Sequence, residues 1–256
     1  MQDFNFDINF NLENKVALIT GAGRGIGKSI AQLFAAKGAD LILVGKSNNV
    51  VNVAKEINES GRNCIPLVFD LTIEENIKKI VKTAITEFKK IDILVNNAGI
   101  VFLDEAAVMP KENWDNTIAL NLTAPFMLSQ AVGREMIRRE YGRIINIASL
   151  AGVLGYEKRA AYCSSKAGII GLTKALAFEW AKYNICVNSI SPTVTMTEMA
   201  EVAWAGKKGE EMKRKIPLGR FIYPEEVSAV AAFLVSDAAK MITGTNIIID
   251  GGYSIN

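Results

Sequence analysis

Residues 20–27 of the chain read Thr-Gly-Ala-Gly-Arg-Gly-Ile-Gly, and this stretch decides the fold. It follows an apolar run at 16–20, which is typical of a buried strand, and it opens a segment of helical period at 26–37. Between a strand and a helix, glycines permit a tight turn and let backbone N–H groups approach a pyrophosphate, which the helix N-terminus then stabilises. The context therefore predicts a dinucleotide site, whose candidate residues are Gly21, Arg24, Gly25, Ile26 and Gly27.

Outward from this turn, short β-branched runs alternate with longer segments of helical period. Such alternation is typical of a parallel sheet that helices cover on both faces. We predict strands at 16–20, 41–45, 64–69, 91–95, 143–148, 186–190 and 246–250. We predict helices at 26–37, 49–60, 74–89, 111–139, 160–182 and 224–236. The expected fold is α/β: a single Rossmann domain over residues 1–256 with a doubly wound, seven-stranded parallel sheet.

Length and charge agree with one soluble domain. The chain has 256 residues, half of them apolar, and a net charge of +2 from 29 basic and 27 acidic residues, enough for a large core. The densest basic cluster, 207–215, is interleaved with Glu210 and Glu211, which favours a solvated helix and no nucleic-acid partner. No apolar run approaches the roughly 18 residues of a membrane span, and residues 1–7 lack signal-peptide features. We therefore expect a cytoplasmic protein without a membrane partner.

Cysteine and histidine usage narrows the chemistry further. The three cysteines, Cys64, Cys163 and Cys186, leave one unpaired in any disulfide scheme and show no metal-ligand spacing, so we expect reduced thiols and no metal. The sequence contains no histidine. Ser-His-Asp hydrolases and histidine-ligated metal sites are therefore excluded.

Tyr162 and Lys166 are candidates for a general acid/base pair, because residues four apart share one face of a helix. A free phenol has a pKa near ~10, and an ammonium group nearby favours the phenolate and lowers that pKa. Alone, such a spacing more often marks a solvated helix face. Two further side chains strengthen the case: Ser149 at the end of the predicted strand 143–148, and Asn121 in Leu120-Asn121-Leu122.

Together these residues resemble those of the short-chain dehydrogenase/reductase family. The resemblance implies that Tyr162 exchanges a proton with the reacting alcohol or carbonyl oxygen and that Ser149 hydrogen-bonds this oxygen. It implies that Lys166 lowers the pKa of Tyr162 and holds the nicotinamide ribose, and that Asn121 anchors a water in the proton path. The cofactor carries the hydride chemistry.

The resemblance also implies cofactor contacts along later strand ends. Asp70 would accept a hydrogen bond from the adenine amino group, and the Asn-Asn-Ala-Gly motif at 96–99 would border the adenosine ribose. Thr193 stands where the family usually has glycine, which adds bulk beside the nicotinamide, whereas Thr195 and Thr197 would contact its carboxamide. The implied contacts beyond the glycine-rich turn are Asp70, Leu71, Asn97, Ala98, Gly99, Tyr162, Lys166, Pro192, Thr195 and Thr197.

The choice of cofactor depends on the end of the second predicted strand. An acidic residue there would bind the ribose hydroxyls of NAD and repel a 2′-phosphate, but Gly45-Lys46-Ser47 contains none. Lys46 and Arg24 occupy positions at which members of the family that bind the phosphate often carry basic residues, and both can form charge-assisted contacts with it. We therefore expect NADP, with NAD as the alternative in which both side chains point to solvent.

The sequence favours a small polyol or ketose as substrate. The Pro-Thr-Val form at 192–194 resembles polyol and sugar dehydrogenases of the family, including galactitol, threitol and xylulose enzymes. One alternative is a 3-oxoacyl carrier-protein reductase, although Met127 and Phe178 stand where those enzymes carry arginines that dock an acidic carrier. A second alternative is another small-ketone reductase or a steroid-type enzyme of the family. The third is a catalytically silent dinucleotide-binding regulator, against which the intact set of four candidate catalytic residues argues.

Three further expectations concern the surroundings of the site. Residues 192–224 have mixed helical character and are placed to form a substrate lid. The resemblance begins near Asn11, leaves residues 1–10 as an extra N-terminal segment, and implies a homotetramer, with a dimer as the alternative. Candidates for the substrate rim are Ala151, Val153, Tyr156, Glu157, Arg159, Met196, Met199 and Trp204.

Overall fold

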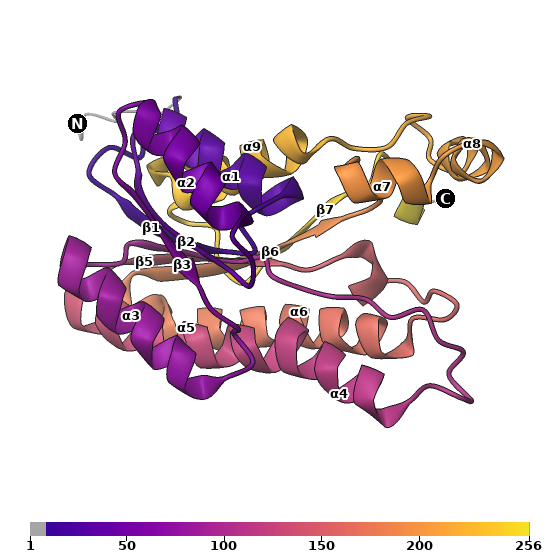
Figure 1. Ribbon diagram of the computed structural model, residues 1–256, viewed down its shortest axis with the longest axis horizontal. Coiled ribbons are helices and arrows are strands. Elements are labelled where there is room, and N and C mark those ends of the chain that lie inside the picture. The colour runs from indigo at the N-terminus through magenta and orange to yellow at the C-terminus, as the bar shows by residue number, and fades with distance from the viewer. Residues whose placement is uncertain (1–8, 256) are drawn as a thin grey trace.

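A computed structural model describes residues 9–255 and shows one seven-stranded sheet (Figure 1). Its strands are β1 (Val16–Thr20), β2 (Asp40–Gly45), β3 (Cys64–Val68), β4 (Ile93–Asn96), β5 (Gly142–Ile147), β6 (Ile185–Pro192) and β7 (Asn246–Ile249). The strand order is β3-β2-β1-β4-β5-β6-β7, and all neighbouring pairs are parallel. The predicted α/β fold is confirmed. Most of the extra N-terminal segment, 1–10, lies outside the described residues.

Helices cover both faces of this sheet (Figure 1). One face carries α1 (Gly25–Ala36), α2 (Asn49–Glu59) and α9 (Pro224–Val235), and the other carries α3 (Glu74–Phe88), α4 (Lys111–Ile118), α5 (Ala124–Arg139) and α6 (Ala160–Trp180). Alternate residues of β1 supply the two cores, because Ile19 belongs to the same core as Phe34 of α1, whereas Leu18 belongs to the same core as Leu128 of α5. Strands buried on both faces explain the continuous apolar runs in the sequence.

The strand order reverses between β1 and β4, where the chain leaves one half of the sheet for the other. In open α/β sheets, ligands bind at such a switch point, beyond the carboxyl ends of the strands. Those ends bring together residues 20–27, 96–99, 147–149 and 192–197, which are all segments that the sequence analysis singled out. The topology therefore places the motifs at one edge of one sheet.

The predicted helix over 111–139 is continuous, but it contains a feature that the sequence did not indicate. A π-helical turn, Ala119–Thr123, joins α4 to α5. Asn121 lies in this turn and is buried, and its side chain hydrogen-bonds across to the backbone of Ile100. Single π-helical turns inside helices frequently occur at functional sites. The other predicted elements differ from the observed ones only at their ends.

Residues 192–224 contain two short helices, α7 (Glu198–Ala203) and α8 (Lys207–Arg214), near the carboxyl end of β6 (Figure 1). Backbone hydrogen bonds join Met196 to Ile222 and Ile222 to Val194, which closes the base of this segment. Its lid function stays a prediction. Within the described chain, no helix combines the length and the apolar character needed to cross a membrane, and Cys64, Cys163 and Cys186 are free thiols.

A buried carboxylate ties the amino ends of the central strands together. Asp92, which is 1% exposed, accepts a hydrogen bond from the Val16 amide at 2.9 Å and pairs with Lys90 at 2.9 Å and Arg139 at 2.8 Å. Burial is the largest influence and raises the pKa of Asp92, but the hydrogen bonds from Lys90, Arg139 and Val16 together leave the pKa below its usual value. Asp92 therefore stabilises the fold as an anion.

We predict that Asp92→Asn lowers the free energy of unfolding by about 3 kcal/mol at pH 7, because two cations lose their buried partner. The native pKa is depressed, so this stabilisation is present above the unfolded pKa of about 4 and is lost as the pH falls through the native pKa. Urea unfolding should therefore show a larger difference between wild type and variant at pH 7 than at pH 3. Asp115→Asn, in an exposed pair with Lys111, is the control and should change little.

Candidate active site

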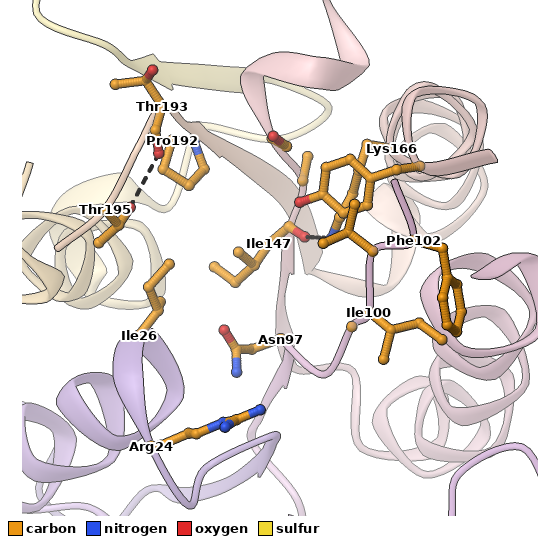
Figure 2. A pocket seen from close by; sticks show the side chains of 15 residues that line it. Arg24, Ile26, Asn97, Ile100, Phe102, Ile147, Lys166, Pro192, Thr193 and Thr195 are labelled. Atoms are coloured by element: carbon orange, nitrogen blue, oxygen red, sulfur yellow. Dashed lines mark hydrogen bonds between the residues drawn. The ribbon is translucent and has the colours of Figure 1, made fainter. Parts of the chain in front are cut away.

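The carboxyl ends of β1, β4, β5 and β6 surround a cavity of about 410 Å³ (Figure 2). Side chains from distant parts of the chain meet there, with Arg24 and Ile26 on one side and Lys166 and Phe102 on the other. The cavity is lined by Arg24, Ile26, Asn97, Gly99, Ile100, Val101, Phe102, Ile147, Ala148, Ser149, Tyr162, Lys166, Pro192, Thr193 and Thr195. The structure thus brings together the glycine-rich turn and three of the four candidate catalytic side chains.

The glycine-rich turn is held against the end of β4 with no room for side chains. Gly21 and Gly25 have φ of +63° and +54°, which favour glycine. A Cβ on Gly27 would lie 2.3 Å from the Gly21 carbonyl oxygen and 2.5 Å from Asn97 Nδ2. Asn97 Nδ2 also donates hydrogen bonds to the carbonyl oxygens of Thr20 and Gly21 at 2.9 and 3.2 Å. This is a cradle that exposes backbone N–H groups at the start of α1, as a pyrophosphate requires.

Thr20 and Thr197 complete the cradle. The Thr20 hydroxyl accepts hydrogen bonds from the amides of Asn97 and Ala98 at 2.9 and 3.1 Å, which fixes β1 to the residues after β4. The Thr197 hydroxyl caps α7 by accepting from the Ala200 amide at 3.3 Å, and its methyl group faces Gly25. The structure therefore places Thr197 beside the glycine-rich turn, although its hydroxyl is already used in capping.

At the ends of β2 and β3, Lys46 and Asp70 form an ion pair at 2.7 Å. The lysine is 82% exposed and the aspartate 23% exposed. The hydrogen bond from Lys46 is the largest influence on Asp70 and, with those from Thr72, lowers the pKa of Asp70 to about 2. Asp70, expected to contact the adenine, and Lys46, expected near the 2′-position of the ribose, thus form an ion pair with each other. The Leu71 side chain is buried in the core, so that its predicted cofactor contact could be made only by its backbone.

The catalytic candidates lie where β5 meets α6. Lys166 is buried, and its ammonium donates a hydrogen bond to the Ile147 carbonyl oxygen at 2.7 Å (Figure 2). The Lys166 Nζ atom lies 5.7 Å from the centre of the Tyr162 ring. The Ser149 hydroxyl accepts from the Ala151 amide at 3.1 Å and is hydrogen-bonded to Tyr162. Two hydroxyls and a cation therefore converge on one wall of the cavity.

Asn121 stands behind this wall as a brace. Its Oδ1 accepts from the Ile100 amide at 2.9 Å, and its Nδ2 donates to the Ile100 carbonyl oxygen at 2.8 Å and to the Ser165 hydroxyl at 3.2 Å. Gly99 fits between this side chain and Lys166, since a Cβ there would lie 3.2 Å from Asn121 Oδ1 and 3.7 Å from Lys166 Nζ. Asn121 thus fixes the loop after β4 relative to α6.

The electrostatics differ from the simple expectation that Lys166 lowers the pKa of Tyr162. Burial dominates and raises the pKa of Tyr162, while the hydrogen bond with Ser149 and then the charge of Arg159 oppose the rise. Burial also lowers the pKa of Lys166 to about 8. The lysine is therefore mainly protonated at pH 7, and its charge is directed at the Ile147 carbonyl oxygen.

Sequence reasoning missed one part of the wall. Ile100, Val101 and Phe102 follow the Asn-Asn-Ala-Gly motif and line the cavity, as do Ile147 and Ala148 at the end of β5. The only signal for them was position, since each directly follows or ends a predicted central strand. Among the described residues no group of three or more histidine, cysteine, aspartate or glutamate side chains could hold a metal ion.

Comparison with known proteins identifies the family. A family model described as enoyl-(acyl carrier protein) reductase matches residues 21–254. The NAD-dependent glycerol dehydrogenase of Listeria innocua is 52% identical over 250 residues, which cover 98% of each chain. This chain belongs to the short-chain dehydrogenase/reductase family. The D-threitol dehydrogenase of Mycolicibacterium smegmatis is 41% identical over 99% of this chain and 98% of its own.

A solved structure of the same family supports the cofactor. A protein from Beutenbergia cavernae, assigned as an NAD(P)-dependent gluconate 5-dehydrogenase and holding NADP, superposes with a TM-score of 0.92. It is 35% identical, and the match covers 96% of this chain and 99% of that one. The glycine cradle of this short-chain dehydrogenase/reductase fits the same group, and the chain is an NAD(P)-dependent oxidoreductase. Whether NADP is preferred stays a prediction.

Gly27→Ala should abolish cofactor binding in this short-chain dehydrogenase/reductase, because its Cβ would overlap the Gly21 carbonyl oxygen and push α1 away from β4. Gly171→Ala is the matched control, since no atom lies within 4 Å of its added Cβ. Titrating each variant with NADH and NADPH, read by cofactor fluorescence, should give at least a hundredfold weaker binding for Gly27→Ala only. Unchanged binding in Gly27→Ala would refute the cradle.

Proposed function

We propose that this protein oxidises a secondary hydroxyl of a small polyol and, in reverse, reduces the matching ketose. The convergence of Ser149, Tyr162 and Lys166 on the cavity that also receives the glycine-rich turn carries the proposal. The glycerol and threitol dehydrogenases among the relatives support the substrate class. NAD(P), when bound, supplies or accepts the hydride.

The roles of the four side chains follow from where they lie. Tyr162 holds a proton on its hydroxyl, since burial raises its pKa, and it would give this proton to the carbonyl oxygen or take one from the alcohol. Ser149 is hydrogen-bonded to the same hydroxyl and orients the reacting oxygen. Lys166 is fixed by Ile147 and holds positive charge at the floor of the cavity. Asn121 keeps the loop that carries Ile100 in place.

Tyr162→Phe should keep cofactor affinity within about threefold and lower turnover by at least a thousandfold, because only the proton-carrying atom is removed. Cofactor fluorescence measures the first, and absorbance at 340 nm with polyols and ketoses measures the second. Tyr183→Phe, a tyrosine outside the cavity, is the control and should leave both unchanged. A Tyr162→Phe variant with normal turnover would remove Tyr162 from the mechanism.

Two other functions fit the structure less well. Carrier-protein reductases would need cations for docking, whereas Phe178 is 90% exposed and Met127 packs against the core, and neither attracts an acidic carrier. A silent regulator would not need Ser149 and Tyr162 hydrogen-bonded in a cavity that is open to substrate. Both alternatives predict no turnover of polyols.

We also propose that the 2′-position of the cofactor is read by Lys46 and Arg24. Lys46 can turn from Asp70 to a phosphate because it is 82% exposed. The Arg24 side chain lines the cavity and forms no hydrogen bond or ion pair within residues 9–255. A phosphate would thus gain two cations, whereas NAD leaves the Lys46–Asp70 pair intact.

Lys46→Asp should weaken NADPH binding by at least tenfold relative to NADH, because the new carboxylate repels the 2′-phosphate. The measured quantity is the ratio of the two dissociation constants. Lys55→Asp, in an exposed pair on α2, is the control for general charge effects. An unchanged ratio in Lys46→Asp would show that another residue reads the 2′-position.

The remaining proposals concern the surroundings. Residues 192–224 would cover bound substrate, which agrees with the place of α7 and α8 beside the cavity residues Pro192, Thr193 and Thr195. A homotetramer is the assembly that the family resemblance favours. A cytoplasmic location is supported by the free thiols at 64, 163 and 186.

A further inference from the structure

Arg159 is a cation near the reaction centre, and it forms no ion pair with any carboxylate in the described part of the chain. It directly precedes α6 and lies three residues before Tyr162, so that both are on one turn of the chain. Within residues 9–255 its guanidinium forms no salt bridge and no side-chain hydrogen bond. The first turn of α6 contains no acidic side chain. Arg159 is half-buried, and a half-buried cation is costly to leave unpaired.

Asp104 and Glu105, two of the acidic residues near Arg159, have other partners, and Glu157, two residues before Arg159, is exposed. Asp104 pairs with Arg159 only through the backbone, and its carboxylate accepts a hydrogen bond from Asn113 Nδ2 at 2.9 Å. Glu105 forms its ion pair with Lys158 at 3.2 Å. Within residues 9–255 no carboxylate forms an ion pair with Arg159, which lies three residues before the cavity-lining Tyr162.

The guanidinium of Arg159 lies over the ring of Tyr156, and its charge affects the pKa of Tyr162. Its central carbon lies 5.4 Å from the centre of the Tyr156 ring. Its charge opposes the rise in the pKa of both tyrosines. Stacking on an aromatic face leaves the edge of a guanidinium, with its N–H donors, free to bind a planar carboxylate through two hydrogen bonds.

Tyr253, near the C-terminal end of the chain, lies in the same cluster as Arg159 and Tyr156. Its hydroxyl is hydrogen-bonded to that of Tyr156. The segment that carries Tyr253 is fixed, since Asp250 accepts hydrogen bonds from the Gly252 and Ser254 amides at 2.9 and 2.7 Å. Burial raises the pKa of Tyr156 to about 12, so its hydroxyl remains a donor at neutral pH. The cluster presents donors and one full positive charge.

We propose that Arg159, Tyr156 and Tyr253 form a subsite for a carboxylate at the far end of the substrate, so that the preferred substrate is a polyhydroxy acid. The proposal rests on the proposed oxidoreductase function of the neighbouring Tyr162. One arginine with two phenol side chains beside it matches a monoanion, whereas a phosphate monoester at pH 7 carries nearly two charges and would need a second cation. The hydroxyl that reacts would lie at Tyr162, with the carboxylate toward Arg159.

The test compares aldonates of four to six carbons with the alditols of the same carbon skeletons, which differ only in the terminal carboxylate. In the wild type, kcat/KM should be at least tenfold higher for the best aldonate than for its alditol. Arg159→Gln should lower kcat/KM for the aldonate at least tenfold, through KM, and leave the alditol value within twofold. Arg159→Lys should recover part of the loss, and Lys158→Gln, on the neighbouring exposed cation, should change neither.

The activity with alditols distinguishes a carboxylate subsite at Arg159 from an indirect effect of Arg159 on Tyr162. An equal fall for aldonate and alditol would overturn the subsite, because Arg159 would then act through Tyr162. Turnover of alditols with no preference for aldonates would also overturn it while leaving the proposed function intact. A preference for a phosphate-ended polyol would overturn the choice of carboxylate.

A binding measurement tests the subsite without turnover. Calorimetric titration of an aldonate into the cofactor complex of Tyr162→Phe should show binding that weakens at least tenfold when Arg159→Gln is added. The same loss in an enzyme that turns over no polyol or acid would support the subsite and refute the oxidoreductase function. Equal affinity with and without Arg159→Gln would refute the subsite.

Discussion

The contact between the start of α1 and the ends of β1 and β4 is the constraint on which the rest of the site depends. Gly27 lies so close to the Gly21 carbonyl oxygen and Asn97 that no side chain fits, and Thr20 fixes the same point from the strand side. This contact determines the direction of α1 and exposes the N–H groups at its first turn. It also sets where the loop after β4 begins, and so the position of Ile100 and its neighbours in the cavity wall.

Buried polar groups transmit that geometry to the reaction centre. Asn121 joins the loop at Ile100 to α6 through Ser165, and Lys166 joins α6 to the end of β5 through the Ile147 carbonyl oxygen. These hydrogen bonds are buried or partly buried, and an unpaired partner there would be costly. The positions of Ser149 and Tyr162 are therefore determined by several elements at once, and a change in one of them would move the others.

Most of the fold and the cavity could be predicted because they depend on local patterns. Apolar strands, helical periodicity and glycine spacing predicted the sheet and the glycine-rich turn, and strand ends predicted many of the residues that line the cavity. The π-helical turn at Asn121 was not predicted, because it accompanies hydrogen bonds between the Asn121 side chain and the backbone of Ile100, which is distant in the sequence. The core position of Leu71 and the pKa of Tyr162 depend on burial. Among the described residues Arg159 forms no ion pair, and this could not be predicted because it depends on the side chains with which Asp104 and Glu105 interact.

The closed base of the segment between β6 and α9 has an evolutionary consequence. Hydrogen bonds at Val194, Met196 and Ile222 join the two ends of this segment directly at the sheet edge. The residues between them can lengthen, shorten or be exchanged at little entropic cost to the fold, since loop closure depends only weakly on loop length. Selection can therefore change the substrate side of the cavity while the cofactor side is preserved. Changes in the one segment between β6 and α9 would then be enough to give the same fold a different substrate.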